Sequence, residues 1–234
     1  MKVAEIKKKL NSLGDAQAAA FHQRFFKTGP GEYGAGDLFR GIRVPVLRRL
    51  AKEYQCLTLT ETEELLHSSY HEDRLLALLI LVNGYPKSDD VIKTKTYDLY
   101  LRNAQFINSW DLVDSSAPHV VGAFLWDKDR DVLYRLARSS DLWERRIAIL
   151  ATFYFIKRGE FSETLKIARI LLSDREDIIH KAVGWMLREV GNQNLDAEES
   201  FLKSHFQRMP RVMLRYAIEK FPESQRQRYL KGEV

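Results

Sequence analysis

The segment Arg146-Ile-Ala-Ile-Leu150 is one of five short stretches that recur along this chain at intervals of 34 to 36 residues. Each stretch opens with a cationic or aromatic residue and continues into residues typical of a helix. The five are Arg74-Leu-Leu-Ala-Leu, Trp110-Asp-Leu-Val-Asp, Arg146-Ile-Ala-Ile-Leu, Lys181-Ala-Val-Gly-Trp and Arg215-Tyr-Ala-Ile-Glu. A regular spacing in this range indicates stacked helical repeats. The sequence therefore predicts an all-α fold, an α-solenoid of antiparallel helix pairs.

The recurrence also predicts which side chains share a face of the stack. Trp110, Arg146 and Lys181 occupy equivalent positions and should point the same way, each from its own repeat. Asp114 and Trp185 follow one helical turn later and should lie beside them, because positions i and i+4 share a helix face. Taken singly, each residue has a simpler interpretation: a core tryptophan, an acid near a helix N-terminus or a solvent-facing cation.

Composition limits the class of protein. The 234 residues are 45% hydrophobic and include only 12 Gly and 6 Pro, which argues for a folded chain. Because a solenoid grows by repetition and needs no second core, we expect a single domain over residues 1–234. The net charge of +5 permits a polyanionic partner without requiring one. The chain has one cysteine, which fits a reducing compartment. Its N-terminal segment is charged and lacks the apolar core of a secretory signal, and its apolar runs are too short to cross a bilayer. We therefore expect a cytoplasmic protein.

Almost every segment has the pattern of a helix. Asp15 is a candidate N-cap, and Pro45 suits the first residue of a helix that runs to about Tyr54. The expected helices are 4–13, 15–27, 45–54, 60–68, 72–84, 88–102, 111–125, 128–139, 141–157, 160–172, 175–190, 196–206, 211–220 and 223–231.

The exception is the Gly-rich stretch 28–42. Its segment Gly29-Pro-Gly-Glu-Tyr-Gly34 matches the dinucleotide fingerprint, but it follows a helix and leads to more loop, so we expect a surface loop and no nucleotide cofactor. His67 and His71 have a metal-compatible spacing but no evident third ligand, and we interpret them as solvated or helix-end residues. The sequence predicts no metal and no cofactor.

A further set of cations accompanies the recurrent segments. On a concave surface, cations from successive repeats would follow a phosphodiester backbone, although charge on helix surfaces is also routine. Any nucleic-acid binding should depend on shape and phosphate, because no module for reading bases is present. The predicted DNA-binding residues are Arg145, Arg146, Lys181, Arg188, Arg211 and Arg215.

Three motifs resemble one known family. They are Asn108-Ser-Trp110-Asp-Leu-Val-Asp114, Trp143-Glu-Arg-Arg146-Ile-Ala-Ile-Leu150 and His180-Lys-Ala-Val-Gly-Trp185-Met-Leu-Arg188-Glu. In this order they are similar to the AlkD-like alkylpurine DNA glycosylases, the DNA alkylation repair enzymes with HEAT-like repeats. The similarity runs from about residue 16 to 229 and includes Gly41-Ile-Arg-Val-Pro45-Val-Leu-Arg48 and 209–220.

The resemblance implies an α-helical solenoid whose concave face binds duplex DNA. Its members hydrolyse the N-glycosidic bond of cationic N3- and N7-alkylated purines and leave an abasic site. The family's catalytic carboxylate matches Asp114, its two cleft tryptophans match Trp110 and Trp185, and its DNA-contacting arginine matches Arg146. We expect a monomer that acts on duplex DNA carrying alkylated purines.

The residue types suit this chemistry. An alkylated purine is already cationic, so it leaves without protonation and one carboxylate suffices where sugar hydrolases use two. Asp114 would stabilise the oxocarbenium-like sugar and orient water, while the indoles offer electron-rich faces to cationic groups.

Two other functions remain open: a non-catalytic protein that binds duplex or junction DNA, and a protein-interaction scaffold. A carboxylate facing DNA argues against both, because it repels phosphate. The Thr28–Phe39 loop departs from the family pattern, and we expect it to affect the level of activity and not the fold.

Overall fold

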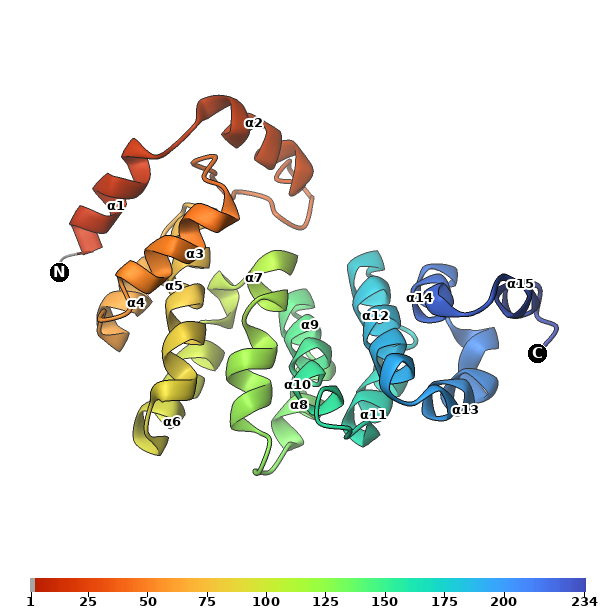
Figure 1. The fold of residues 1–234 in the computed structure, drawn as a ribbon. Helices are drawn as coiled ribbons and strands as arrows, with labels where there is room; N and C mark the ends of the chain where they lie inside the picture. The colour runs from red at the N-terminus through yellow and green to blue at the C-terminus, as the bar shows by residue number, and fades with distance from the viewer. Residues whose placement is uncertain (1–2) are drawn as a thin grey trace. The chain divides into compact units, whose positions relative to one another are not determined.

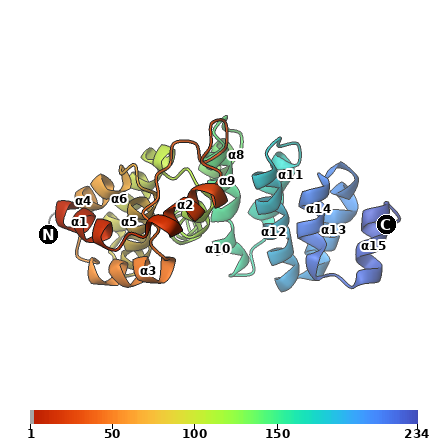
Figure 2. The same cartoon turned by 90° about the horizontal axis from the view of Figure 1, so that it is seen from above.

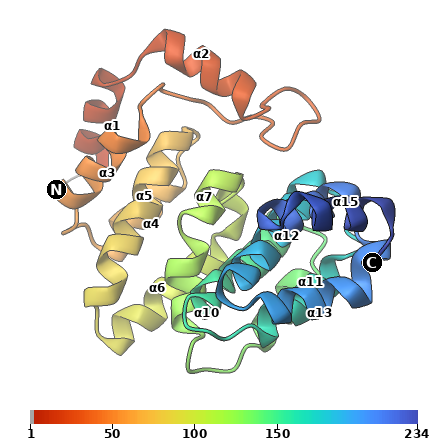
Figure 3. The ribbon, with the colours of Figure 1, turned by 45° about the vertical axis from the view of Figure 1, so that its right-hand side comes forward.

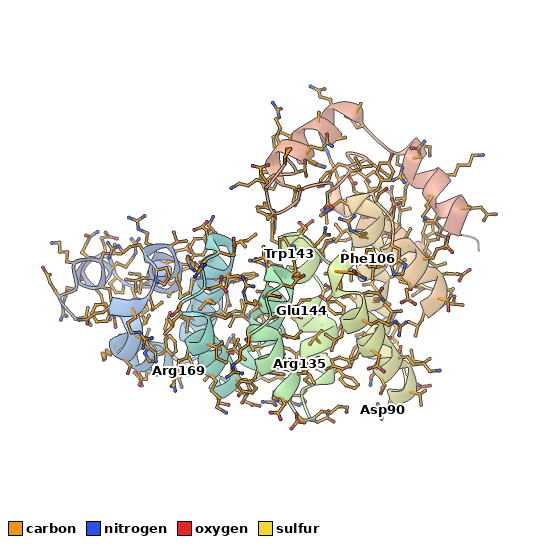
Figure 4. All side chains as sticks on the ribbon, turned by 180° about the vertical axis from the view of Figure 1, so that it is seen from behind. Asp90, Phe106, Arg135, Trp143, Glu144 and Arg169 are labelled. Atoms are coloured by element: carbon orange, nitrogen blue, oxygen red, sulfur yellow. The ribbon has the colours of Figure 1, made fainter. Side chains whose placement is uncertain are left out.

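The computed structural model describes residues 3–234, which divide into two compact units, 3–120 and Val121–Val234. The helices of the first unit are α1 (Val3–Ser12), α2 (Ala16–Phe25), α3 (Val44–Glu53), α4 (Leu59–Leu66), α5 (His71–Gly84), α6 (Asp90–Arg102) and α7 (Trp110–Asp114) (Figure 1). Short 3-10 turns follow α5 and α6 at Tyr85–Lys87 and Ala104–Phe106. Figure 4 shows Asp90 and Phe106 at opposite ends of the α6 segment.

The helices of the second unit are α8 (Asp131–Ala137), α9 (Leu142–Ala151), α10 (Phe153–Ile156), α11 (Ser162–Leu171), α12 (Asp177–Gln193), α13 (Leu195–His205), α14 (Arg211–Ala217) and α15 (Glu223–Lys231). A π-helix, Pro118–Gly122, precedes them in the chain, and 3-10 turns occur at Phe206–Arg208 and Ile218–Lys220. The described residues contain no β-strand, so the all-α prediction is confirmed. None of their helices is long and apolar enough to cross a bilayer.

Local sequence explains where the helices begin. Asp15 caps α2, as predicted, by accepting a hydrogen bond from the Ala18 backbone amide at 2.8 Å. Pro45 lies in the first turn of α3, which begins one residue before the predicted start, at Val44. Thr58 and Glu61 form a reciprocal capping box at the start of α4.

Helix α5 is the centre of the first unit. All of its residues from His71 to Leu81 are buried, because it packs against α3 and α4 and contacts α7. Its sequence is accordingly apolar around the whole helix over Leu75–Leu81, which is the pattern of a helix enclosed by neighbours.

The second unit repeats one packing arrangement. Helices α9, α12 and α14 pack one after another in a row, while α8 and α11 pack against α9 and α12, and α13 against α12 (Figure 2). The recurrent residues Arg146, Lys181 and Arg215 fall on α9, α12 and α14, the three helices of that row. The recurrence thus marks equivalent helices within this unit. The superhelical path and the concave face predicted for the whole chain stay predictions, as does the single domain.

Glycines allow close approach at two places in this unit. A side chain at either position would collide with the neighbouring helical segment, so both must remain without a Cβ. The atoms that a Cβ would meet are Ala151 O at 2.2 Å and Tyr154 Cβ at 2.8 Å for Gly122, and Met213 O at 2.4 Å and Tyr216 Cβ at 2.6 Å for Gly184.

Several predicted helices differ in extent from the structure: 128–139 is Asp131–Ala137, 175–190 is Asp177–Gln193, and 211–220 ends as an α-helix at Ala217. The predicted helices 111–125 and 141–157 are each divided. The segment 111–125 is not one helix: α7 ends at Asp114, because Pro118 has no backbone N–H to donate to the Asp114 carbonyl and its ring obstructs the turn. The segment 141–157 divides at Thr152, whose backbone amide and hydroxyl both bond the carbonyl of Ile149, at 3.3 and 2.7 Å. Helix α10 then begins at Phe153.

Candidate active site in the first unit

A cavity of about 370 Å³ lies in the first unit and contains two of the predicted site residues, Trp110 and Asp114. Helix α7 and the residue after it supply one side of the lining, α3 and α5 supply most of the remainder, and Phe26 lies directly after α2. The lining residues are Phe26, Val44, Arg48, Leu75, Leu79, Trp110, Asp111, Asp114 and Ser115.

Trp110 and Asp114 are the first and last residues of α7, so they lie one helical turn apart on the same face. Both side chains are half-buried, and the buried neighbours Leu112 and Val113 anchor the helix on its other side. Beneath α7, burial raises the pKa of the Tyr100 phenol, and the charge of Asp114 raises it further. The carboxylate of Asp114 therefore has a phenol nearby that stays neutral.

Four rings form a cluster in which Phe26 joins Trp110 to the other two. The indole stacks on Phe26 with centroids 5.4 Å apart and an interplanar angle of 15°. Phe26, Phe39 and the imidazole of His71 contact one another, with centroids 5.0 Å apart for Phe26 and Phe39, 4.6 Å for Phe39 and His71, and 5.0 Å for Phe26 and His71. We call Trp110, Phe26, Phe39 and His71 the aromatic cluster. Phe26, Phe39 and His71 also line a neighbouring cavity of about 350 Å³.

His71 is buried, which corrects the prediction of a solvated residue, although it does begin α5. Its Nε2 lies 2.8 Å from Asp111 Oδ2 and its Nδ1 lies 3.3 Å from Asp37 Oδ2. Burial alone would lower the pKa of His71, but the charge of Asp111 and the hydrogen bonds to Asp111 and Asp37 outweigh it and raise the pKa to about 9. His71 is therefore an imidazolium at neutral pH.

The remaining polar groups around His71 complete a neutral cluster. Arg74 donates from Nη2 to Asp37 Oδ2 at 2.6 Å and to Asn108 Oδ1 at 3.1 Å. Burial raises the pKa of Asp37, but the hydrogen bond from His71 and the charge of Arg74 lower it below the usual value. With Asp111, two carboxylates face two cations, which offsets the cost of burying each charge.

His67 differs from His71. It is exposed, as predicted, with its Nε2 2.6 Å from Asn103 Oδ1 and its ring 4.3 Å from that of Phe106.

The Gly-rich loop 28–42 is the segment between α2 and α3 in Figure 3. It contributes Asp37 and Phe39 to these contacts. Its C-terminal end is fixed to the first turn of α5, because Glu72 accepts hydrogen bonds from the backbone amides of Arg40, Gly41 and Ile42 at 2.9, 2.8 and 3.2 Å. The loop joins α2 to α3 without an intervening strand, so its glycines lack the strand–turn–helix setting that dinucleotide binding requires.

The remaining predicted site residues belong to the second unit. Trp185 is half-buried on α12, and its Nε1 donates to Glu189 Oε1 at 3.0 Å. Arg146 is only 5% exposed, and its Nη1 donates to the carbonyl of Ile178 at 2.6 Å, so the alternative of a solvent-facing charge is wrong for this residue. The convergence of Trp110 and Asp114 with Trp185 and Arg146 stays a prediction.

Most of the predicted DNA-binding cations have protein partners. Lys181 pairs with Asp177 at 2.6 Å, Arg145 with Asp174 at 2.6 Å, and Arg188 with Glu219. Arg211 donates to the carbonyl of Leu230 at 2.7 Å, whereas Arg215 is exposed on α14. These pairs reduce the positive charge that each residue presents to a polyanion.

The sequence interpretation did not assign several residues of this site. Phe26, Phe39 and Asp111 lie within quoted or neighbouring segments, but no spacing rule connects them with Trp110. Exposed Arg48 on α3 also lines the cavity with Asp114. Its one available signal was its place in the segment Gly41–Arg48, at the exposed side of an amphipathic helix.

The described residues form an all-helical fold, and its first unit places the half-buried carboxyl group of Asp114 and the indole of Trp110 in one cavity. The sequence profile of DNA alkylation repair enzymes matches residues 6–221, and the chain belongs to this family. A solved structure described as a predicted DNA alkylation repair enzyme from Enterococcus faecalis has the same fold, with a TM-score of 0.69 at 17% identity over 90% of this chain and 97% of that one. No curated protein matched the sequence significantly.

Proposed function

We propose that the protein is a DNA glycosylase that hydrolyses the N-glycosidic bond of cationic N3- and N7-alkylated purines in duplex DNA. The observation that carries this proposal is the position of Asp114 and Trp110 in one cavity of the first unit. A family of DNA alkylation repair enzymes supplies the class of substrate, and the cavity supplies groups suited to the reaction.

The reaction needs little acid catalysis. Alkylation at N3 or N7 places a positive charge on the purine, so the base departs as a neutral molecule when the bond to C1′ breaks. The electron pair of that bond stays with the base, and the sugar becomes oxocarbenium-like. Asp114 stabilises this cation and accepts the proton of the water that attacks C1′. Trp110 presents an electron-rich indole to the same cations, with a contribution of about 0.5–2 kcal/mol.

Binding of DNA requires cations that reach phosphate. Arg48 is exposed and lines the cavity with Asp114, which makes it the best candidate in the first unit for a phosphate next to the lesion. The roles of Trp185 in the cleft and of Arg145, Arg146, Lys181, Arg188, Arg211 and Arg215 in DNA binding are part of this proposal. No cofactor takes part in the reaction as proposed.

The test is base release from a duplex that contains one N7-methylguanine, measured under single-turnover conditions. Wild type should release the base, and Asp114→Asn should lower the rate by about 100-fold or more, because it removes the charge that stabilises the sugar cation. Binding to the same duplex should be unchanged or tighter, since a negative charge near phosphate is lost.

Asp98→Asn is the matched control. Asp98 is an exposed residue of α6 in the same unit, so this variant makes an identical change of charge away from the cavity and should keep the wild-type rate. Binding without release by wild type would contradict the enzyme and favour a duplex-binding protein. Absence of both binding and release would favour a protein-interaction scaffold.

A further inference from the structure

The aromatic cluster connects the first turn of α7 to His71. Trp110 stacks on Phe26, Phe26 and Phe39 both contact the ring of His71, and Nε2 of His71 lies against Asp111, the residue next to Trp110. The first turn of α7 is thus held at two points by one chain of contacts. The four rings come from the end of α2, the Gly-rich loop, the start of α5 and the start of α7, which are distant in sequence.

Helix α7 needs such support. It has five residues, far fewer than the roughly 12–15 at which an isolated helix becomes marginally stable. Its orientation must therefore come from packing and from side-chain contacts. Leu112 and Val113 fix its buried side, but they do not determine how the half-buried indole of Trp110 is turned.

His71 can hold α7 because both ring nitrogens face carboxylates. The contact to Asp111 is 2.8 Å and the contact to Asp37 is 3.3 Å, so the ring donates in two directions and cannot rotate without losing one bond. Asp111 is fixed from the other side as well, because Ser109 Oγ donates to its Oδ1 at 2.8 Å. The imidazole face simultaneously supports Phe39.

We propose that His71 is a positioning residue that sets the orientation of Trp110 in the cavity, through Asp111 on one side and through Phe39 and Phe26 on the other. It does not touch the reacting atoms. The Gly-rich loop takes part because it supplies Phe39 and Asp37, which gives this departure from the family pattern a role in the site. The expected effect of His71 on the rate of base release rests on the proposed function. The expected effect of His71 on the orientation of the Trp110 indole does not.

The experiment uses the full-length protein labelled with 5-fluorotryptophan and observed by fluorine NMR. Trp110→Phe assigns the resonance of Trp110 among those of the 4 tryptophans. His71→Gln keeps a donor for Asp111 but removes the ring, and His71→Phe keeps the ring but removes both hydrogen bonds. In each variant the Trp110 resonance should shift or broaden while the other three stay in place.

His67→Gln is the control, because His67 is an exposed histidine of the same unit that contacts Asn103 and Phe106 instead of α7. It should leave the Trp110 resonance unmoved. The single-turnover rate of base release should fall about tenfold in His71→Gln, with the Kd for DNA within twofold of wild type, because a displaced group lowers the rate more than the affinity.

An unmoved Trp110 resonance in a folded His71→Gln or His71→Phe protein overturns the proposal, whatever the activity. If neither variant folds, Phe39→Leu removes the ring that packs on both His71 and Phe26 without removing a charge, and the same resonance decides. If wild type releases no base, the proposed function fails, but a shifted Trp110 resonance still supports the positioning role of His71.

Discussion

Glu198 on α13 is expected to make the protein less stable as the pH rises. Its side chain is 2% exposed, and its Oε1 has no hydrogen-bond partner among residues 3–234. Its Oε2 lies where a Cβ on Gly191 would be, at 1.7 Å, so α12 and α13 enclose the carboxyl group closely. Burial raises the pKa of Glu198 to about 8; the charge of Arg188 opposes this increase and that of Glu199 adds to it.

The stability decreases with rising pH because the folded state holds a proton that the unfolded state releases. Between the unfolded pKa near 4.5 and the folded pKa of about 8, the folded state binds a proton that the unfolded state has released, so the free energy of unfolding falls as the pH rises. The slope is about 1.4 kcal/mol per pH unit. Over the whole interval the loss is roughly 5 kcal/mol, a large part of a typical domain's stability.

Glu198→Gln removes this dependence, because the amide is neutral at every pH and nearly isosteric with the acid. In urea unfolding at pH 5, 6, 7 and 8, the variant should gain on wild type by about 1.4 kcal/mol with each unit. Glu199→Gln is the control: hydrogen bonds from Gln225 and Lys203 lower the pKa of Glu199, so it should show no such gain. A difference between Glu198→Gln and wild type that does not change with pH would refute the reasoning.

Two further substitutions test the cations. Arg48→Ala should weaken binding to duplex DNA, because Arg48 is exposed at the cavity with Asp114. In titrations at several salt concentrations, the slope of log K against log salt should decrease in magnitude by about 1. An unchanged slope would show that Arg48 does not contact phosphate. Arg146→Ala should lower the free energy of unfolding by about 1–3 kcal/mol, because the buried guanidinium no longer donates to the carbonyl of Ile178; an unaltered urea midpoint would contradict this structural role.

The sequence predicted the helices well where local chemistry decides their ends. Asp15 caps α2 as expected, and α3 begins at Val44, one residue before Pro45, because capping and proline geometry act within one turn. The effect of Pro118 was also a local signal, but the apolar pattern of 111–125 obscured it. The recurrence identified equivalent helices in the second unit, because repeated packing imposes repeated spacing.

The site was less accessible to prediction. The pair Trp110 and Asp114 follows from helical spacing and from the family resemblance, and both residues line one cavity. The aromatic cluster could not be predicted in this way, because its rings come from four segments that only tertiary structure brings together. His71 shows the difficulty most clearly: nothing near it in the sequence reveals that Asp37 and Asp111 enclose it and keep it charged.

The close contacts at Gly122 and Gly184 restrict changes in the length of the repeats. The residues that crowd them, Ala151 and Tyr154 in one case and Met213 and Tyr216 in the other, follow at identical sequence intervals. An insertion or deletion between a glycine and these residues would bring a bulkier side chain beneath the adjacent backbone, where no space exists for it. Contact at one atom thus restricts insertions and deletions across a whole helix pair, which gives a physical reason why the recurrence along this chain drifts so little.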